Sequence, residues 1–162
     1  MPADLVYSWD EVPTGLLPSA PLTGPFPTRP FLEAWRSHHT ASDATTPIAI
    51  AAAGAVPLWI DDDVVRFAGQ ANLTDYHSPL GGPLHECVSL VAKRYSGSRF
   101  SFDSLPNEAL EPLASALGAA GVGATARTHD ATLIIDLPAD HDGWFRSLPK
   151  KRRHEIRRKR RR

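Results

Sequence analysis

The densest group of chemically active side chains lies in the last thirteen residues, 150–162, which read KKRRHEIRRKRRR. Ten of them are Lys or Arg, and Glu155 is the only acid. The whole chain has eighteen basic and eighteen acidic residues, so residues 1–149 keep eight and seventeen of them, and a tail of about +9 follows a body of about −9. The cations that we expect to meet phosphates or carboxylates are Lys150, Lys151, Arg152, Arg153, Arg157 and Arg158.

This basic tail is open to three interpretations. It could bind nucleic acid without sequence preference, because Lys and Arg neutralise phosphates. It could lie on anionic lipid, but Ile156 is its only apolar residue, so we expect no membrane insertion. It could also be a connecting helix whose arginines meet acidic or phosphate groups elsewhere in a larger protein. In each case we expect weak polyanion binding through the tail.

Within the body, the best polar cluster is the run Asp75, Tyr76 and His77, which lies in a loop between two expected elements. A carboxylate, a phenol and an imidazole so close together could bind a polar substrate. The alternative is a structural turn in which the Asp75 side chain caps its own backbone.

Other candidate residues favour structure over chemistry. Gly118, Gly121 and Gly123 resemble a phosphate-binding loop, but a helix leads into them and a strand leads out, the reverse of the order that such a loop needs. Cys87 lies on an apolar helix face, where a buried, inert thiol is expected. The histidines are scattered with no metal-binding spacing, so we predict no metal site.

Several elements must position these residues. Apolar alternation predicts strands over residues 5–9, 47–53, 55–60, 64–68, 99–102, 124–128 and 131–137. Helical spacing predicts helices after Thr28, over 85–95, after the expected cap Asn107, and after the cap Asp140. The fold class is therefore α+β or mixed α/β, with a largely antiparallel sheet flanked by helices. The expected core comprises Trp35, Leu58, Phe67, Phe102, Leu113, Leu117, Leu133, Ile135 and Trp144.

Length and composition indicate the domain organisation and the cellular compartment. The length of 162 residues suits one compact domain over 1–148, with an irregular loop over 13–30 and a basic helical tail over 149–162. A single cysteine excludes an intrachain disulfide and fits a reducing compartment. The N-terminal sequence does not have the pattern of a secretory signal, so we expect a cytoplasmic protein.

Four segments in order resemble the N-terminal half of the CelD-like, FemAB-related acetyltransferases of the GNAT superfamily. They are FLEAW at 31–35, RFAG at 66–69 with DYHSP at 75–79, FDSLP at 102–106, and the block from Ile135-Asp-Leu-Pro138 through Trp144 and Ser147-Leu148 to Arg162. The last is the most specific, and the resemblance covers nearly the whole chain after residue 28.

This resemblance implies a GNAT-like lobe of an acyltransferase that uses acetyl-CoA or another acyl-CoA. Family members have two such lobes, and the second holds most of the cofactor site. The basic tail corresponds to the connector, and Gly118 stands where the family has Gln or Arg. We therefore expect a truncated chain that binds no cofactor alone and that pairs with a second lobe or with another copy of itself. The resemblance assigns no catalytic residue to this chain. The alternatives are a small nucleic-acid-binding protein and a non-catalytic interaction domain.

Overall fold

The computed structural model describes residues 2–39, 44–69, 73–132, 136 and 138–160. The chain divides into two compact units, Met1–Thr125 and Ala126–Arg162. The first contains a sheet with helices on both faces, and the second contains two helices. The predicted boundary between 148 and 149 falls between these two helices of the second unit.

The sheet has six strands and is mostly antiparallel, which confirms the predicted mixed α/β class. Its strands run in the order β1-β2-β3-β4-β6, and β5 pairs with β3 off this path. Only the β4–β6 pair is parallel among the pairs of the described residues. Their bounds are β1 Asp4–Val6, β2 Ile48–Ala51, β3 Gly54–Asp61, β4 Val64–Phe67, β5 Leu80–Gly81 and β6 Arg99–Phe100.

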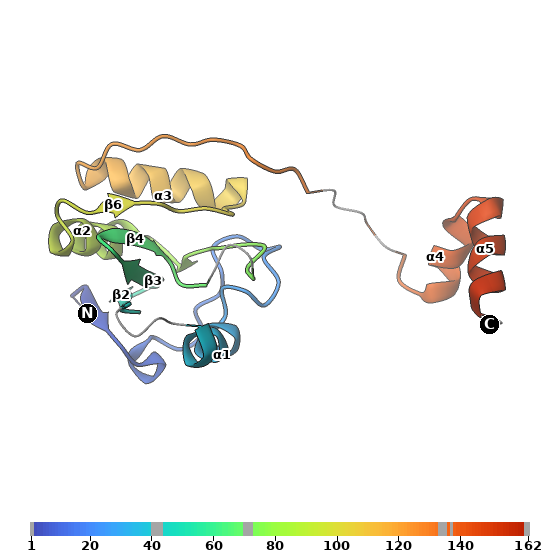
Figure 1. Ribbon diagram of the computed structural model, residues 1–162, viewed down its shortest axis with the longest axis horizontal. Helices are drawn as coiled ribbons and strands as arrows, with labels where there is room; N and C mark the ends of the chain where they lie inside the picture. Colours follow the sequence, from blue (N-terminus) through green and yellow to red (C-terminus); the bar gives the residue numbers. More distant parts are fainter. Residues whose placement is uncertain (1, 40–43, 70–72, 133–135, 137, 161–162) are drawn as a thin grey trace. The chain divides into compact units, whose positions relative to one another are not determined.

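Helices cover both faces of this sheet (Figure 1). Helix α1, Arg29–His39, lies on one side, while α2, His85–Arg94, and α3, Asn107–Ala119, lie on the other. Because alternate strand residues point to opposite faces, Ile48 and Ile50 of β2 join the core under α1, and Ala49 and Ala51 join the core under α2 and α3. Both faces of the sheet are therefore buried at its centre.

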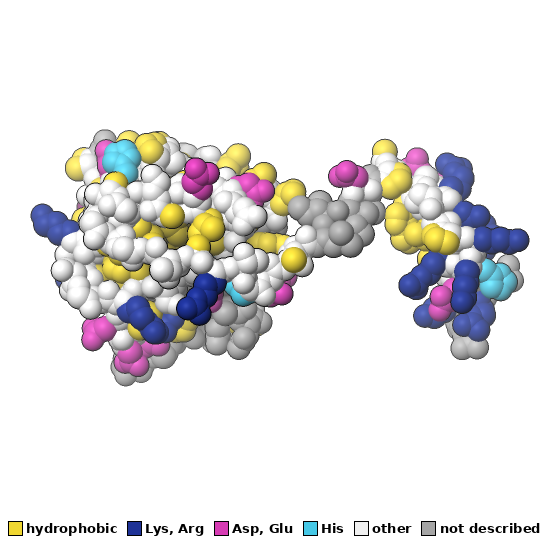
Figure 2. Space-filling view, turned by 90° about the horizontal axis from the view of Figure 1, so that it is seen from above, with side chains coloured by type: hydrophobic (Ala, Val, Ile, Leu, Met, Phe, Trp, Pro, Cys, Tyr) yellow, Lys and Arg dark blue, Asp and Glu magenta, His cyan; other side chains and the backbone are white. Residues whose placement is uncertain are grey.

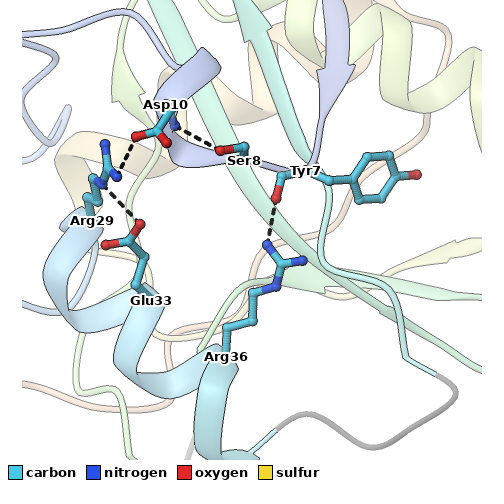
Figure 3. A network of polar contacts seen from close by, with 6 residues as sticks. All are labelled: Tyr7, Ser8, Asp10, Arg29, Glu33 and Arg36. Carbon is cyan, nitrogen blue, oxygen red and sulfur yellow. Dashed lines mark hydrogen bonds and ion pairs between the residues drawn. The ribbon is translucent and has the colours of Figure 1, made fainter.

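The irregular segment before α1 is ordered against the sheet edge. Ser19 donates its backbone N–H to Pro79 O at 2.9 Å, and Gly81 donates to Leu17 O at 2.7 Å. Short polar bonds then hold α1 to the chain before it (Figure 3): Arg29 pairs with Asp10 at 2.7 Å, and Arg36 donates to Tyr7 O at 2.6 Å. These contacts satisfy polar groups of a loop that has no strand ladder of its own.

Most of the predicted core is confirmed. Buried residues include Trp35, Leu58, Phe67, Leu113 and Leu117. Phe102 is only half-buried, at the edge of the cluster under α2 and α3. Trp144 was wrong as a core residue, because it is half-buried on a two-helix unit too small to enclose an indole. Leu133 and Ile135 lie outside the described residues.

Two local predictions were wrong. Residues 124–128 form no strand and are exposed, because small and polar side chains give this stretch no apolar face to bury. The cap of α3 is Pro106, and Asn107 is the first helical residue; proline fixes an extended backbone angle there and leaves the side chain of Asn107 without a capping role. Most of the expected strand over 131–137 lies outside the described residues.

The second unit consists of α4, His141–Ser147, and α5, Lys150–Arg160. Asp140 caps α4 as predicted, accepting from Gly143 N–H at 2.6 Å. Leu148 and Pro149 separate the two helices, since the residue before proline disfavours helical geometry. Among the described residues, no helix has both the length and the apolar character needed to cross a membrane.

Candidate functional site

The three residues of the predicted polar cluster at 75–77 differ in exposure. Asp75 is exposed, Tyr76 is half-buried, and His77 is 4% exposed. His77 instead meets Asp103, which follows β6 and was not among the predicted site residues. The only sequence signal for it was its place in the FDSLP segment.

Asp103 fixes the tautomer of His77. The Nδ1 atom lies 3.1 Å from Asp103 O and 3.0 Å from Asp103 Oδ1. A carbonyl oxygen can only accept, so Nδ1 carries a proton and donates. The backbone joins the same two segments, because His77 N–H donates to Ser104 O at 2.9 Å.

The free nitrogen of this ring faces a crowded polar corner. His77 Nε2 and Thr74 Oγ1 are both buried with no hydrogen-bond partner in the described part of the chain. Both approach Gly69, where an added Cβ would lie 2.6 Å from Thr74 Oγ1 and 3.0 Å from His77 Nε2. Gly69 also has a φ of +106°, which side chains rarely adopt.

A carboxylate that orients an imidazole is the arrangement of a general base. Here, however, the ring is stacked on Phe67, with centroids 5.7 Å apart and planes at 14°, and is almost fully enclosed. The His77–Asp103 pair joins the loop 73–79 to the segment after β6.

Cys87 has a buried thiol of low expected reactivity. It is fully buried on α2, and its thiol donates to Gly54 O at 3.6 Å. Burial, with a smaller contribution from the charge of Glu86, raises the pKa of the Cys87 thiol to about 11. Because the thiolate is the nucleophile, this group is inert near neutral pH, as predicted.

Gly118 lies in the last turn of α3, and Gly121 and Gly123 follow the helix end. Val122 N–H donates to Leu117 O at 2.9 Å, and Gly121 N–H donates to Gly118 O at 3.0 Å. Gly121 has a φ of +77°. This pair of bonds around a left-handed glycine is the Schellman motif, so the carbonyls of the helix end are satisfied and no cradle for an anion forms. No group of metal-binding side chains occurs among the described residues.

The basic helix is the one strongly charged surface that the sequence predicted. Between Lys150 and Arg160, α5 has eight Lys or Arg residues against Glu155 alone. Figure 2 shows these cations gathered over the C-terminal unit. Of the six predicted basic residues, five are exposed: Lys150, Lys151, Arg152, Arg157 and Arg158.

Arg153 differs from its neighbours because it holds α5 to α4. Its Nη1 atom donates to Arg146 O and to Leu148 O, each at 2.8 Å. These are carbonyls at the C-terminal end of α4, where helices have unpaired acceptors and a partial negative charge. Arg157 adds a cation–π contact, with its guanidinium 5.0 Å from the Phe145 ring centre. The aromatic side chain of Phe145 thus lies beside a cation of α5, although the tail sequence itself contains no Phe, Trp or Tyr.

Comparisons with known protein families, with characterised proteins and with solved structures gave no match to this chain.

Proposed function

We propose that this chain is the N-terminal lobe of a GNAT-type N-acyltransferase that uses an acyl-CoA, and that it does not catalyse transfer alone. The proposal rests on the resemblance of four sequence segments to that family. The observation that supports it best is that two of these segments, RFAG with DYHSP and the later FDSLP, pack against one another.

The packing runs through Phe67 of the RFAG segment. Its ring lies 4.7 Å from Phe102 of the FDSLP segment and 5.7 Å from His77 of the DYHSP segment. The pair of His77 and Asp103 then closes the set at 3.0 Å. Residues that form one packed unit are constrained together, which gives a physical reason for the three patterns to occur as a group.

The mixed sheet with helices on both faces is the architecture that the GNAT resemblance implies. Gly118 and Gly121 take part in the C-terminal cap of α3, so they give the body no pyrophosphate cradle. In this proposal the acyl-CoA and the transfer chemistry therefore belong to a second lobe, and α5 is the connector that leads to it.

Reading the coding DNA beyond the codon for Arg162 in all frames tests the family assignment. The proposal expects a GNAT-like second half, with a strand, a glycine loop and a helix, and with Gln or Arg leading the loop. Unrelated sequence in every frame would contradict it and would favour a free-standing function.

A second candidate function is weak, sequence-independent binding of polyanions through α5. The observation that favours it is the seven Lys and Arg residues exposed on this one helix: Lys150, Lys151, Arg152, Arg157, Arg158, Lys159 and Arg160. Contacts from such side chains to phosphates position a ligand and do not read its sequence.

Binding of a mixed-sequence duplex and of a heparin-like polyanion across a salt series tests this function. We expect both to bind, with an affinity that falls steeply as salt rises, and we expect removal of 150–162 to abolish binding while the first unit stays folded. A strong preference for one DNA sequence that survives at physiological salt would contradict the sequence-independent mode. It would also identify the chain as a specific nucleic-acid-binding protein.

A further inference from the structure

Three neighbouring side chains on the α1 side of the sheet have buried hydrogen-bond donors with no acceptor. Trp59 of β3 and Arg66 of β4 are direct cross-strand partners, so their side chains share one face of the sheet. The guanidinium of Arg66 lies 5.4 Å from the Trp59 ring centre. Trp35 of α1 packs edge-on against Trp59, with centroids 5.8 Å apart. The three residues form one continuous group.

The polar atoms of this group are all donors. Trp35 Nε1, Trp59 Nε1 and Arg66 Nη1 are buried and have no hydrogen-bond partner in the part of the chain that the structure describes. Neither an indole nor a guanidinium can accept, so these side chains cannot satisfy one another. A buried donor without an acceptor is costly, more so when it carries charge, and such groups are rare in folded proteins.

The arginines of α1 behave differently. Arg29 pairs with the carboxylates of Asp10 and Glu33, and Arg36 donates to the backbone oxygen of Tyr7 (Figure 3). The fold therefore supplies acceptors to these two cations on this side of the sheet, whereas no described residue accepts from Arg66 Nη1. Arg66 stacks on Trp59, and Trp59 packs against Trp35, so an external acceptor could complete this chain of unpaired donors.

We propose that Trp35, Trp59 and Arg66 form a binding site for a carboxylate group, a role that is independent of the proposed acyltransferase lobe. A carboxylate offers two adjacent oxygens with about four acceptor positions, enough for three donors. Its single negative charge matches the single guanidinium. Trp59 and Arg66 are only half-buried, so parts of both side chains reach the surface, while the three donor atoms themselves are buried.

Water fits this site less well. A water molecule accepts two hydrogen bonds and brings two donors of its own, which would need acceptors that the three side chains cannot give. A phosphate dianion brings a second negative charge with no matching cation among the three residues. A carboxylate supplies acceptors only and balances the charge.

Calorimetric titration of the full chain with sodium acetate, against sodium chloride of equal ionic strength, tests this site. We expect acetate to bind and chloride not to. Arg66→Gln removes the charge and should weaken acetate binding by about tenfold or more, and Trp59→Phe keeps a ring but removes the N–H and should weaken it by about three- to tenfold.

Arg94→Gln is the matched control, because Arg94 also stacks on an aromatic ring, 5.6 Å from the centre of Tyr95, but lies outside the group. Its affinity for acetate should equal that of the native protein. If thermal melting shows that Arg66→Gln is unfolded, Trp59→Phe and Trp35→Phe test the same donors singly. Absence of acetate binding to the native chain, unchanged binding in the folded variants, or stronger binding of inorganic phosphate than of acetate would each overturn the proposal.

Discussion

At Gly69, the backbone angle and the surrounding side chains both favour glycine. A φ of +106° disfavours any side chain, and a Cβ would lie within 3.0 Å of both Thr74 Oγ1 and His77 Nε2. Neither atom belongs to a long, flexible side chain that could move aside. The loop that contains His77 can therefore close on β4 only while this position is glycine.

We predict that Gly69→Ala lowers the free energy of unfolding by about 1–3 kcal/mol more than Gly97→Ala does. Gly97 is the matched control because its φ of +95° is just as unfavourable, but a Cβ there would meet nothing within 4 Å. Urea denaturation of both variants measures the difference. Equal losses would show that backbone strain alone matters and that the corner around His77 has room.

Burial of Cys87 predicts that its thiol reacts slowly in the folded protein. Since burial raises the pKa of this thiol from its ordinary 9.0 to about 11, the native protein should react very slowly with a disulfide reagent at pH 8 and rapidly once denatured. The unfolded thiol ionises at lower pH than the folded one, so stability should fall as pH rises from about 9 towards 11. Fast labelling of the folded protein at pH 8 would contradict the buried position.

Among the elements, α3 contributes the clearest buried stripe. Leu113 and Leu117 join the core under the sheet, whereas Leu110 is only half-buried. Hydrophobic residues at this spacing hold a helix more strongly than its intrinsic propensity does, which matters here because Pro112 lies inside α3.

We expect Leu113→Ala to lower the free energy of unfolding by about 2–5 kcal/mol, because it removes a side chain that is 2% exposed and leaves a cavity. Leu110→Ala, on the same helix with the same chemistry, should cost clearly less. Chemical denaturation of the two variants makes the comparison. A larger effect at Leu110 would mean that α3 is rotated about its axis.

In the second unit, substitutions of Arg153 and Arg152 should distinguish the stability of α5 from its charge. Arg153→Ala removes the bonds to Arg146 O and Leu148 O and should weaken α5 by about 1–3 kcal/mol, seen as faster amide hydrogen exchange over 150–160 in the full chain. Arg152→Ala removes an equal charge from an exposed position, so its exchange should change little.

Polyanion binding should respond more to Arg152→Ala. Arg152 is exposed, so its loss should lower the slope of log affinity against log salt by about 0.9 if that side chain meets a phosphate, whereas Arg153 donates to backbone carbonyls and its loss should change the slope less. Identical exchange in the two variants would contradict the role of Arg153 in joining α5 to α4.

The sequence predicted elements wherever the periodicity was local and strong. The β3–β4 hairpin and α2 have alternating or helical apolar patterns with turn residues at their ends, and both were found. The two-residue strand β5 was missed because such a short strand has no pattern of its own. The pairing of His77 with Asp103 joins residues 26 positions apart, so it depends on tertiary packing that single-sequence reasoning does not reach. The grouping of Trp35, Trp59 and Arg66 depends in the same way on strand register.

For the molecule as a whole, the main feature is that the body and the basic tail have opposite net charges. The first unit has a sheet with two buried clusters, and of its candidate residues His77 and Cys87 are buried, Tyr76 is half-buried and Asp75 is exposed. The second unit concentrates the cations on α5. The central proposal is that this chain is a lobe that supports transfer chemistry performed elsewhere.

The most direct measurement is calorimetric titration of acetyl-CoA into two proteins. One is the chain of 162 residues, and the other is the same chain continued by the polypeptide that its gene encodes after Arg162. The proposal predicts no binding to the first and micromolar binding to the second, since the cofactor site belongs to the second lobe. Micromolar binding to the 162-residue chain alone, or no binding to either protein, would contradict it.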